Sequence, residues 1–360
     1  MQNNLQHGGG LAQLLSGQPL AIDAAYWHSS LYEAETLQRT ITAEEIGRLR
    51  GVQSARIIDP NTGETINEAT NLSRTANVPK GSIAYLHLTG VMISQDFLWF
   101  RGVNHLAAEL IAANANPNIG GIVLEVNSGG GEVRAGQMLL AAMTGLSTPV
   151  AVFAHYMASA AVMATLPALH IIASSPGAEI GSIGTYGQYH LNTVKYQREA
   201  YKTIYAKRST LKNKIWRAIL GNDYSLAEQH INIINDRFIA DVKRHRRVDS
   251  DVFTGDIYAA QTALSKGLID QVGTFPDALH WASMKSRMKL EKPKPKKEVT
   301  PPKARPAKSK AQLEIMAAVV EGMKAAKGET ATEIDQTPSY LKNPINQRAS
   351  RSSGTQKNHQ

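Results

Sequence analysis

Short apolar runs alternate with segments of helical periodicity through residues 82–174. Runs rich in β-branched residues predict strands at 83–91, 119–126, 149–154 and 170–174. The segments between them predict helices at 103–115, 132–146 and 158–166, and Asn116-Pro117 ends the first helix. Strands and helices that alternate at this spacing predict βαβ units, and therefore an α/β fold with a mostly parallel sheet flanked by helices.

Helical patterns continue after this alternating region. Apolar side chains recur at nearly helical spacing within residues 224–244, at Leu226, Ile231, Ile234, Phe238 and Val242. A shorter helix is expected within 259–269, before the polar turn that follows it. The pattern therefore places one domain at residues 81–285.

The segments on either side of this domain have different compositions. Residues 1–80 are expected to form an N-terminal extension, with a helix at 42–50 that begins with a capping box and a turn at 59–63. Residues 286–310 alternate lysine with proline, which is typical of a solvated linker. A short amphipathic helix is expected at 311–328, and the polar residues 329–360 are expected to be disordered.

Composition narrows the possible functions. The net charge of +9 is concentrated in the lysine- and proline-rich linker, so nucleic-acid binding is not expected to be the main function. The chain has no cysteine, which excludes thiol catalysis and disulfides. Neither a signal peptide nor an apolar run long enough to span a membrane is visible, so the expected location is the cytoplasm.

A glycine loop is the first candidate for chemistry. The buried strand at 119–126 runs into Asn127-Ser128-Gly129-Gly130-Gly131, and a helix follows. Unhindered backbone N–H groups at the carboxyl end of a parallel strand can bind a developing oxyanion. Phosphate binding is a rival interpretation, but the loop has neither the G-x-G-x-x-G sequence nor the Lys-Ser/Thr pair of a P-loop. A plain turn remains the simplest alternative.

Ser159 is the second candidate, because it follows a strand and lies among small residues that would admit a substrate backbone. A small residue chosen for helix packing is the alternative.

A nucleophilic serine needs a base, yet no histidine lies in a triad motif. His155 is the nearest histidine. Lys207, Lys212 and Lys214 are the other candidates, and a lysine base must be kept neutral by burial or nearby positive charge. Ser182, within Gly181-Ser182-Ile183-Gly184, could orient the lysine.

Taken in order, these motifs resemble the signal peptide peptidase A (protease IV) family, which includes the lambda-type phage capsid maturation proteases. The matching segments are Val126–Gly131, where Gly129 replaces the family's usual proline, Ala158–Ala161, Gly181–Gly184, Thr254-Gly255 and Gly267–Asp270. The resemblance covers about residues 82–277 and implies the Clp protease/crotonase-like fold. The departure from the family pattern is at Ala206–Lys212, where the family has a lysine motif of different sequence.

The resemblance implies a serine endopeptidase that works through a Ser-Lys dyad and an acyl-enzyme. Ser159 would be the nucleophile. Lys212 would be the base, since its interval from Ser159 is similar to that of the family, with Lys207 as second choice. The backbone N–H groups of Gly130 and Ala160 would form the oxyanion hole, and Ser182 would support the lysine. No cofactor or metal is implied, and the expected substrate is a peptide or protein with small or apolar residues near the scissile bond.

The N-terminal segment 14–23 and the basic C-terminal extension resemble the phage branch of the family, which predicts a phage or prophage capsid maturation protease. Capsid or scaffold proteins would then be partners, and a homo-oligomer is expected, with Ser159 and the lysine in the same or in neighbouring subunits. Three alternatives remain open: a cellular signal-peptide-degrading peptidase, an acyl-CoA enzyme of the crotonase fold, and a catalytically silent capsid assembly or scaffold protein.

Overall fold

The computed structural model describes residues 18–23, 26, 55–69, 72, 78–97 and 100–291. They belong to the first of two compact units, Met1–Lys294 and Pro295–Gln360. The helices expected at 42–50 and 311–328, most of the linker and the tail at 329–360 lie outside the described residues.

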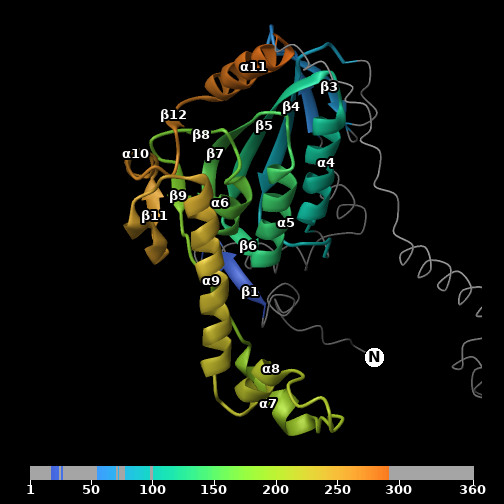
Figure 1. Cartoon of the computed structure of the whole chain (residues 1–360), viewed down its shortest axis with the longest axis vertical. Coiled ribbons are helices and arrows are strands. Elements are labelled where there is room, and N and C mark those ends of the chain that lie inside the picture. The colour runs from blue at the N-terminus through green and yellow to red at the C-terminus, as the bar shows by residue number, and fades with distance from the viewer. Residues whose placement is uncertain are drawn as a thin grey trace, which may run out of the picture. The chain divides into compact units, whose positions relative to one another are not determined.

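A nine-stranded sheet forms the centre of the described part of the chain (Figure 1). Its order is β11-β9-β7-β5-β4-β2-β3, with β8 paired to β7 and β12 to β8. The parallel strands are β4 (Ser82–Thr89), β5 (Ile119–Ser128), β7 (Val150–Ala158), β8 (His170–Ala173), β9 (Glu179–Gly181) and β12 (Gln271–Val272). The antiparallel strands are β2 (Ala55–Ile58), β3 (Thr65–Ala69) and β11 (Ile257–Ala259). The predicted α/β fold with a mostly parallel sheet is confirmed.

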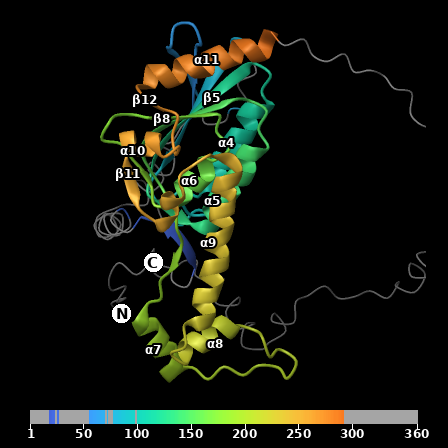
Figure 2. The same ribbon diagram turned by 60° about the vertical axis from the view of Figure 1, so that its left-hand side comes forward.

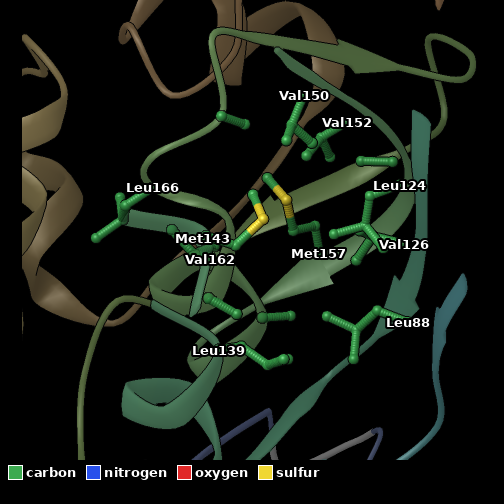
Figure 3. Packing of buried hydrophobic residues seen from close by; sticks show 14 of the residues in the cluster. Leu88, Leu124, Val126, Leu139, Met143, Val150, Val152, Met157, Val162 and Leu166 are labelled. Carbon is green, nitrogen blue, oxygen red and sulfur yellow. The ribbon is translucent and has the colours of Figure 1, made fainter. Parts of the chain in front are cut away.

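Helices cover both faces of this sheet. Consecutive residues of a strand point to opposite faces, so each strand contributes to two hydrophobic clusters. One face packs against α4 (Val103–Ala115), α5 (Val133–Thr144) and α6 (Ala160–Thr165). Figure 3 shows this cluster, in which Met143 of α5 lies with Val126 and Met157 of the strands. The other face packs against α11 (Phe275–Glu291), through Ala278 and Ala282.

A long helix, α9 (Ser225–His245), links the sheet to a small helical subassembly made by α7 (Leu191–Ala200) and α8 (Lys214–Leu220). Phe238 and Val242 of α9 belong to the main core, whereas Ala227 packs in a separate cluster with Ile219. Ala227 and Phe238 are about 16 Å apart along the helix axis at the usual rise per residue. Figures 1 and 2 accordingly show α7 and α8 at the end of α9 that lies away from the sheet.

The N-terminal extension contributes strands to the domain. β2 and β3 form a hairpin whose turn matches the predicted one at 59–63: the Asn61 N–H donates to Asp59 Oδ1 at 2.7 Å, and Gly63 has a φ of 75°. At the other end, α11 continues past Lys285 to Glu291. Between α9 and α11 lie a 3₁₀ helix (Ser250–Thr254) and α10 (Ala260–Ser265).

A second, three-stranded sheet has the order β10-β1-β6. Its strands are β10 (Tyr186–Gly187), β1 (Pro19–Ile22) and β6 (Gly130–Glu132), and β1 is antiparallel to both neighbours. Within the described residues, no helix combines the length and apolar character needed to span a membrane.

Candidate active site

Ser159 lies in a sharp turn between β7 and α6. Its φ of 58° and ψ of −114° are outside the regions that residues other than glycine usually adopt. Strain of this kind persists only where the surrounding structure enforces it, and it concentrates at functional sites. A strained serine between a strand and a helix is the arrangement of the nucleophile elbow of hydrolases. The sequence did not reveal it, because Met157 and Ala161 stand where that motif has glycines.

The segment Gly181–Gly184 holds Ser159 in this conformation. The Ser159 N–H donates to the Gly181 carbonyl at 2.8 Å, and the Ser159 hydroxyl donates to the Gly184 carbonyl at 3.3 Å. Ser182 lies between these two contacts and also has a positive φ, 52°, while its N–H donates to the Asp256 carbonyl. The structure therefore brings Ser182 beside Ser159, with backbone carbonyls making the described contacts to the serine.

The glycine loop lies against the first residue of α6. Gly130 has a φ of 95°, and a Cβ added there would lie 2.8 Å from the Ala160 nitrogen and 2.2 Å from the Ala21 carbonyl oxygen. Only glycine fits this close approach of three backbone segments. Ala160 begins α6, so its N–H has no carbonyl partner within that helix. The two residues predicted to form an oxyanion hole, Gly130 and Ala160, are thus neighbours.

The N–H groups of the loop point in different directions. The Gly130 N–H donates to the Ser128 hydroxyl oxygen at 3.2 Å, and that hydroxyl donates to the Gly90 carbonyl at 2.6 Å. On one edge of β6, Met92 contacts the Gly130 carbonyl and the Glu132 N–H. Backbone groups alternate between the two edges of a strand, so the Gly131 N–H faces the opposite edge. Gly131, which the sequence did not single out, is therefore the loop donor that faces β1.

The candidate lysines lie in another part of the fold. Lys207, Lys212 and Lys214 are all exposed, and they lie between α7 and the first turn of α8. This segment is at the end of α9 remote from α6 (Figures 1 and 2). Within one chain the structure therefore does not bring Lys212 or Lys207 together with Ser159.

His155 lies inside β7, which extends beyond the predicted strand to Ala158. Its Nε2 lies 2.6 Å from Glu125 Oε1, and His87 Nδ1 lies 3.1 Å from Glu125 Oε2. The hydrogen bond from His87, with smaller contributions from Tyr85 and His155, lowers the pKa of Glu125 to about 2 although burial opposes this. The imidazole of His155 is thus engaged with a carboxylate. No set of three or more His, Asp or Glu side chains in the described ranges is arranged to hold a metal ion.

A strained serine lies beside a glycine loop and an N–H group at the start of a helix, an arrangement that resembles the sites of hydrolases. The family comparison makes the class specific: residues 147–289 match the model of Peptidase family S49. This match supports placing the segment with the signal peptide peptidase A family of peptidases.

Two curated relatives agree with this assignment. The chain is 28% identical over 221 residues to Protease 4 of Salmonella typhi, covering 58% of this chain and 35% of that protein. It is 30% identical over 179 residues to a protein of Methanocaldococcus jannaschii that is named as a protease, covering 45% of this chain and 55% of that protein. The chain thus spans about a third to a half of the length of these relatives.

Solved structures similar to the chain include an enoyl-CoA hydratase/isomerase family protein from Hyphomonas neptunium, with 17% identity and a TM-score of 0.31. The alignment covers 76% of this chain and 88% of that one. Another is ClpP1 from Listeria monocytogenes, with 15% identity and a TM-score of 0.34 over 54% of this chain and 94% of that one.

Proposed function

We propose that the protein is a serine endopeptidase with Ser159 as its nucleophile. The observation that carries this proposal is the strained turn at Ser159, which adjoins the N–H of Ala160 and the glycine loop. The Ser159 hydroxyl would attack a peptide carbonyl and form an acyl-enzyme, which water then hydrolyses. Backbone N–H groups aimed at the developing oxyanion stabilise such an intermediate without reorganising. Ala160 would supply one N–H group, and Gly131 or Gly130 the other.

We propose Lys212 as the base, with Lys207 as second choice. Lys212 is exposed in the segment between α7 and α8, and these two helices lie at the end of α9 that is remote from α6. This arrangement supports a dyad assembled from two copies of the chain, in which Lys212 of one copy approaches Ser159 of the next. A lysine acts as a base only in its neutral form, and burial favours that form. Packing of the α7–α8 segment against a neighbouring copy would supply this burial and would couple activity to assembly.

Labelling with a fluorophosphonate probe tests the nucleophile. The wild-type protein should become labelled and the Ser159→Ala variant should not, whereas Ser175→Ala, an exposed serine outside the site, should label like the wild type. Lys212→Ala should also lose labelling, with Lys195→Ala on α7 as its matched control. Equal labelling of wild type and Ser159→Ala would overturn the assignment of the nucleophile. Loss in Lys207→Ala but not Lys212→Ala would move the base to Lys207.

Mixing two inactive variants tests the shared dyad. Ser159→Ala and Lys212→Ala proteins should each be inactive alone, and their mixture should regain part of the wild-type hydrolysis of a fluorogenic peptide with small, apolar residues. Recovery occurs only if one copy supplies the serine and another supplies the lysine. A mixture that stays inactive, although the two variants co-assemble, would contradict a dyad shared between copies.

Within the family, we propose a phage or prophage capsid maturation protease. The support is the resemblance of residues 14–23 and of the basic C-terminal extension to phage-encoded members. Cleavage of a capsid or scaffold protein encoded beside it, abolished by Ser159→Ala, would bear this out. Cleavage of signal peptides alone would favour a cellular peptidase. A folded and assembled protein that cleaves neither would favour a silent scaffold.

A further inference from the structure

The small sheet places a segment of the chain itself next to the candidate active site. β1 lies between β6 of the glycine loop and β10, with Ala21 opposite Gly131 and Leu20 opposite both Glu132 and Tyr186. β10 begins two residues after Gly184, whose carbonyl accepts the hydrogen bond from the Ser159 hydroxyl. An extended segment inserted between two strands in this way has the geometry of a peptide bound by strand addition.

The register of β1 directs one carbonyl group to the proposed oxyanion donors. The Asp23 N–H donates to the Gly129 carbonyl at 2.8 Å, so Asp23 and Gly129 form a hydrogen-bonded antiparallel pair. Such pairs recur at every second residue, which makes Ala21 and Gly131 the next one. The Ala21 carbonyl therefore faces the Gly131 N–H. The Ala21 carbonyl oxygen and the Ala160 nitrogen both lie close to the position that a Cβ on Gly130 would occupy, at 2.2 Å and 2.8 Å. The carbonyl of a bound peptide is expected at this place.

The side chains of β1 are buried. Leu20 and Ile22 are buried in a cluster with Val91 and Ile93, and Ala21 is fully buried in the main core. Alternate residues of a strand point to opposite faces, so Leu20 and Ile22 share one face while Ala21 takes the other. The environment of β1 therefore accepts a small side chain next to the glycine loop, with a large aliphatic side chain before and after it.

Contacts after β1 anchor this strand. The Tyr26 N–H donates to Asp23 Oδ1 at 3.0 Å, and the Tyr26 hydroxyl donates to the Asn127 carbonyl at 3.2 Å. The Tyr26 ring stacks on Tyr156 with a centroid separation of 5.4 Å. Burial, and then a hydrogen bond to Asp23, raises the pKa of Tyr156. The anchor holds β1 through the loop that precedes β6 and through β7.

We propose that β1 is an internal occupant of the substrate groove, which keeps the site closed until the strand is displaced. The groove would take an extended peptide in which a small residue lies between two aliphatic ones, as Ala21 lies between Leu20 and Ile22. This inference rests on the proposed function, because a filled groove inhibits the protein only if the protein is a peptidase. The binding of such a peptide can nevertheless be measured without turnover.

The test uses the full-length chain with Ser159→Ala, which cannot turn over. A second substitution, Ala21→Arg, places a long charged side chain where the structure has no room for one. Gln18→Arg makes the same change at an exposed position of the same segment and serves as the matched control. The probe is a fluorescein-labelled peptide, Gln-Pro-Leu-Ala-Ile-Asp, and binding is followed by fluorescence anisotropy. A peptide with Arg in place of Ala is the negative control.

The Ala21→Arg protein should bind the probe at least about tenfold more tightly than the parent or the Gln18→Arg protein, because vacating the groove raises the fraction of binding-competent molecules. Hydrogen exchange at residues 18–23 should rise in the same variant. A folded Ala21→Arg protein that does not bind the probe would overturn the proposal, and so would equal binding by all three proteins. If Ala21→Arg does not fold, the double variant Leu20→Asp, Ile22→Asp replaces it.

Failure of the proposed function gives a different result. If Ser159 is not a nucleophile, wild-type protein and all β1 variants fail to react with the fluorophosphonate, whereas the anisotropy result is unaffected. If both proposals hold, Ala21→Arg in the Ser159-containing protein should also label at least about tenfold faster than the wild type, for the same population reason.

Discussion

The ring of Tyr26 occupies the space that a side chain on Gly129 would fill: a Cβ on Gly129 would lie 2.3 Å from Cγ of Tyr26. The family motif that this segment resembles has proline at this position. The departure from the family motif and the packing of Tyr26 over the loop therefore occur together. Glycine at 129 permits the contact that anchors the strand next to the site.

Replacing Gly129 by alanine should loosen this anchor. The new methyl group would collide with the Tyr26 ring, so either the ring or the loop must move, at a cost typical of overpacking, about 1–3 kcal/mol. Hydrogen exchange of residues 18–26 should speed up. Gly145→Ala is the control, since its Cβ would meet nothing closer than 3.5 Å. Unchanged exchange in Gly129→Ala would show that Tyr26 does not hold β1.

The strained backbone at Ser159 should give different stabilities to two variants that both lack the hydroxyl. Glycine adopts positive φ without the steric cost that alanine carries, so Ser159→Gly should be more stable than Ser159→Ala by about 1 kcal/mol. Urea unfolding of the two variants measures the difference. An alanine variant as stable as the glycine variant would mean that the turn relaxes when the hydroxyl is lost.

The C-terminal half of α9, which is buried in the main core, should contribute most of the free energy that attaches this helix to the domain. Phe238 is 1% exposed in the main core, so Phe238→Ala should lower the free energy of unfolding by about 3–5 kcal/mol. Ile233 on the same helix is 52% exposed, and Ile233→Ala should change the stability by no more than about 0.5 kcal/mol. Equal losses from the two substitutions, measured by urea unfolding, would contradict this packing of α9.

Acid should destabilise the protein partly through Glu125. Its pKa is lowered from 4.5 to about 2 in the folded state, chiefly by the hydrogen bond from His87. Between these two values the unfolded chain binds a proton that the folded chain does not, so this contribution to stability is complete above pH 4.5 and is lost as the pH falls toward 2.

The Glu125→Gln variant isolates this effect, because glutamine does not titrate. The loss of stability on lowering the pH from about 5 to about 3, followed by urea midpoints, should be smaller in the variant than in the wild type. Identical losses in the two proteins would show that the three-residue cluster of His87, Glu125 and His155 does not hold the carboxylate ionised.

Periodicity predicted the architecture because most of its elements are defined locally. The helix expected at 103–115 is α4 to the residue, since Asn116-Pro117 ends it. β6 could not be predicted in this way: Gly130–Glu132 has no strand pattern, and it is a strand because β1 and Met92 pair with it. Residues far apart in the sequence decide such pairings.

The same distinction applies to the site. Ser159, the glycine loop and the Gly181–Gly184 segment can be recognised as sequence motifs, and the structure brings them together. The positive φ of Ser159 and the direction of the Gly131 N–H depend on backbone geometry that residue types do not encode. The position of Lys212 depends on the course of α9, and the role of this lysine stays a prediction.

α7 and α8 are attached to the rest of the domain through one end of α9 and through the short segment that follows β10, so that α9 acts as a lever. Phe238 and Val242 form its pivot in the main core, while the lysine-bearing segment lies beyond the opposite end. A small tilt about this pivot would move Lys212 through a much larger arc than it moves any residue near the sheet. The position of the lysine can therefore be tuned by substitutions at the pivot that never touch the substrate.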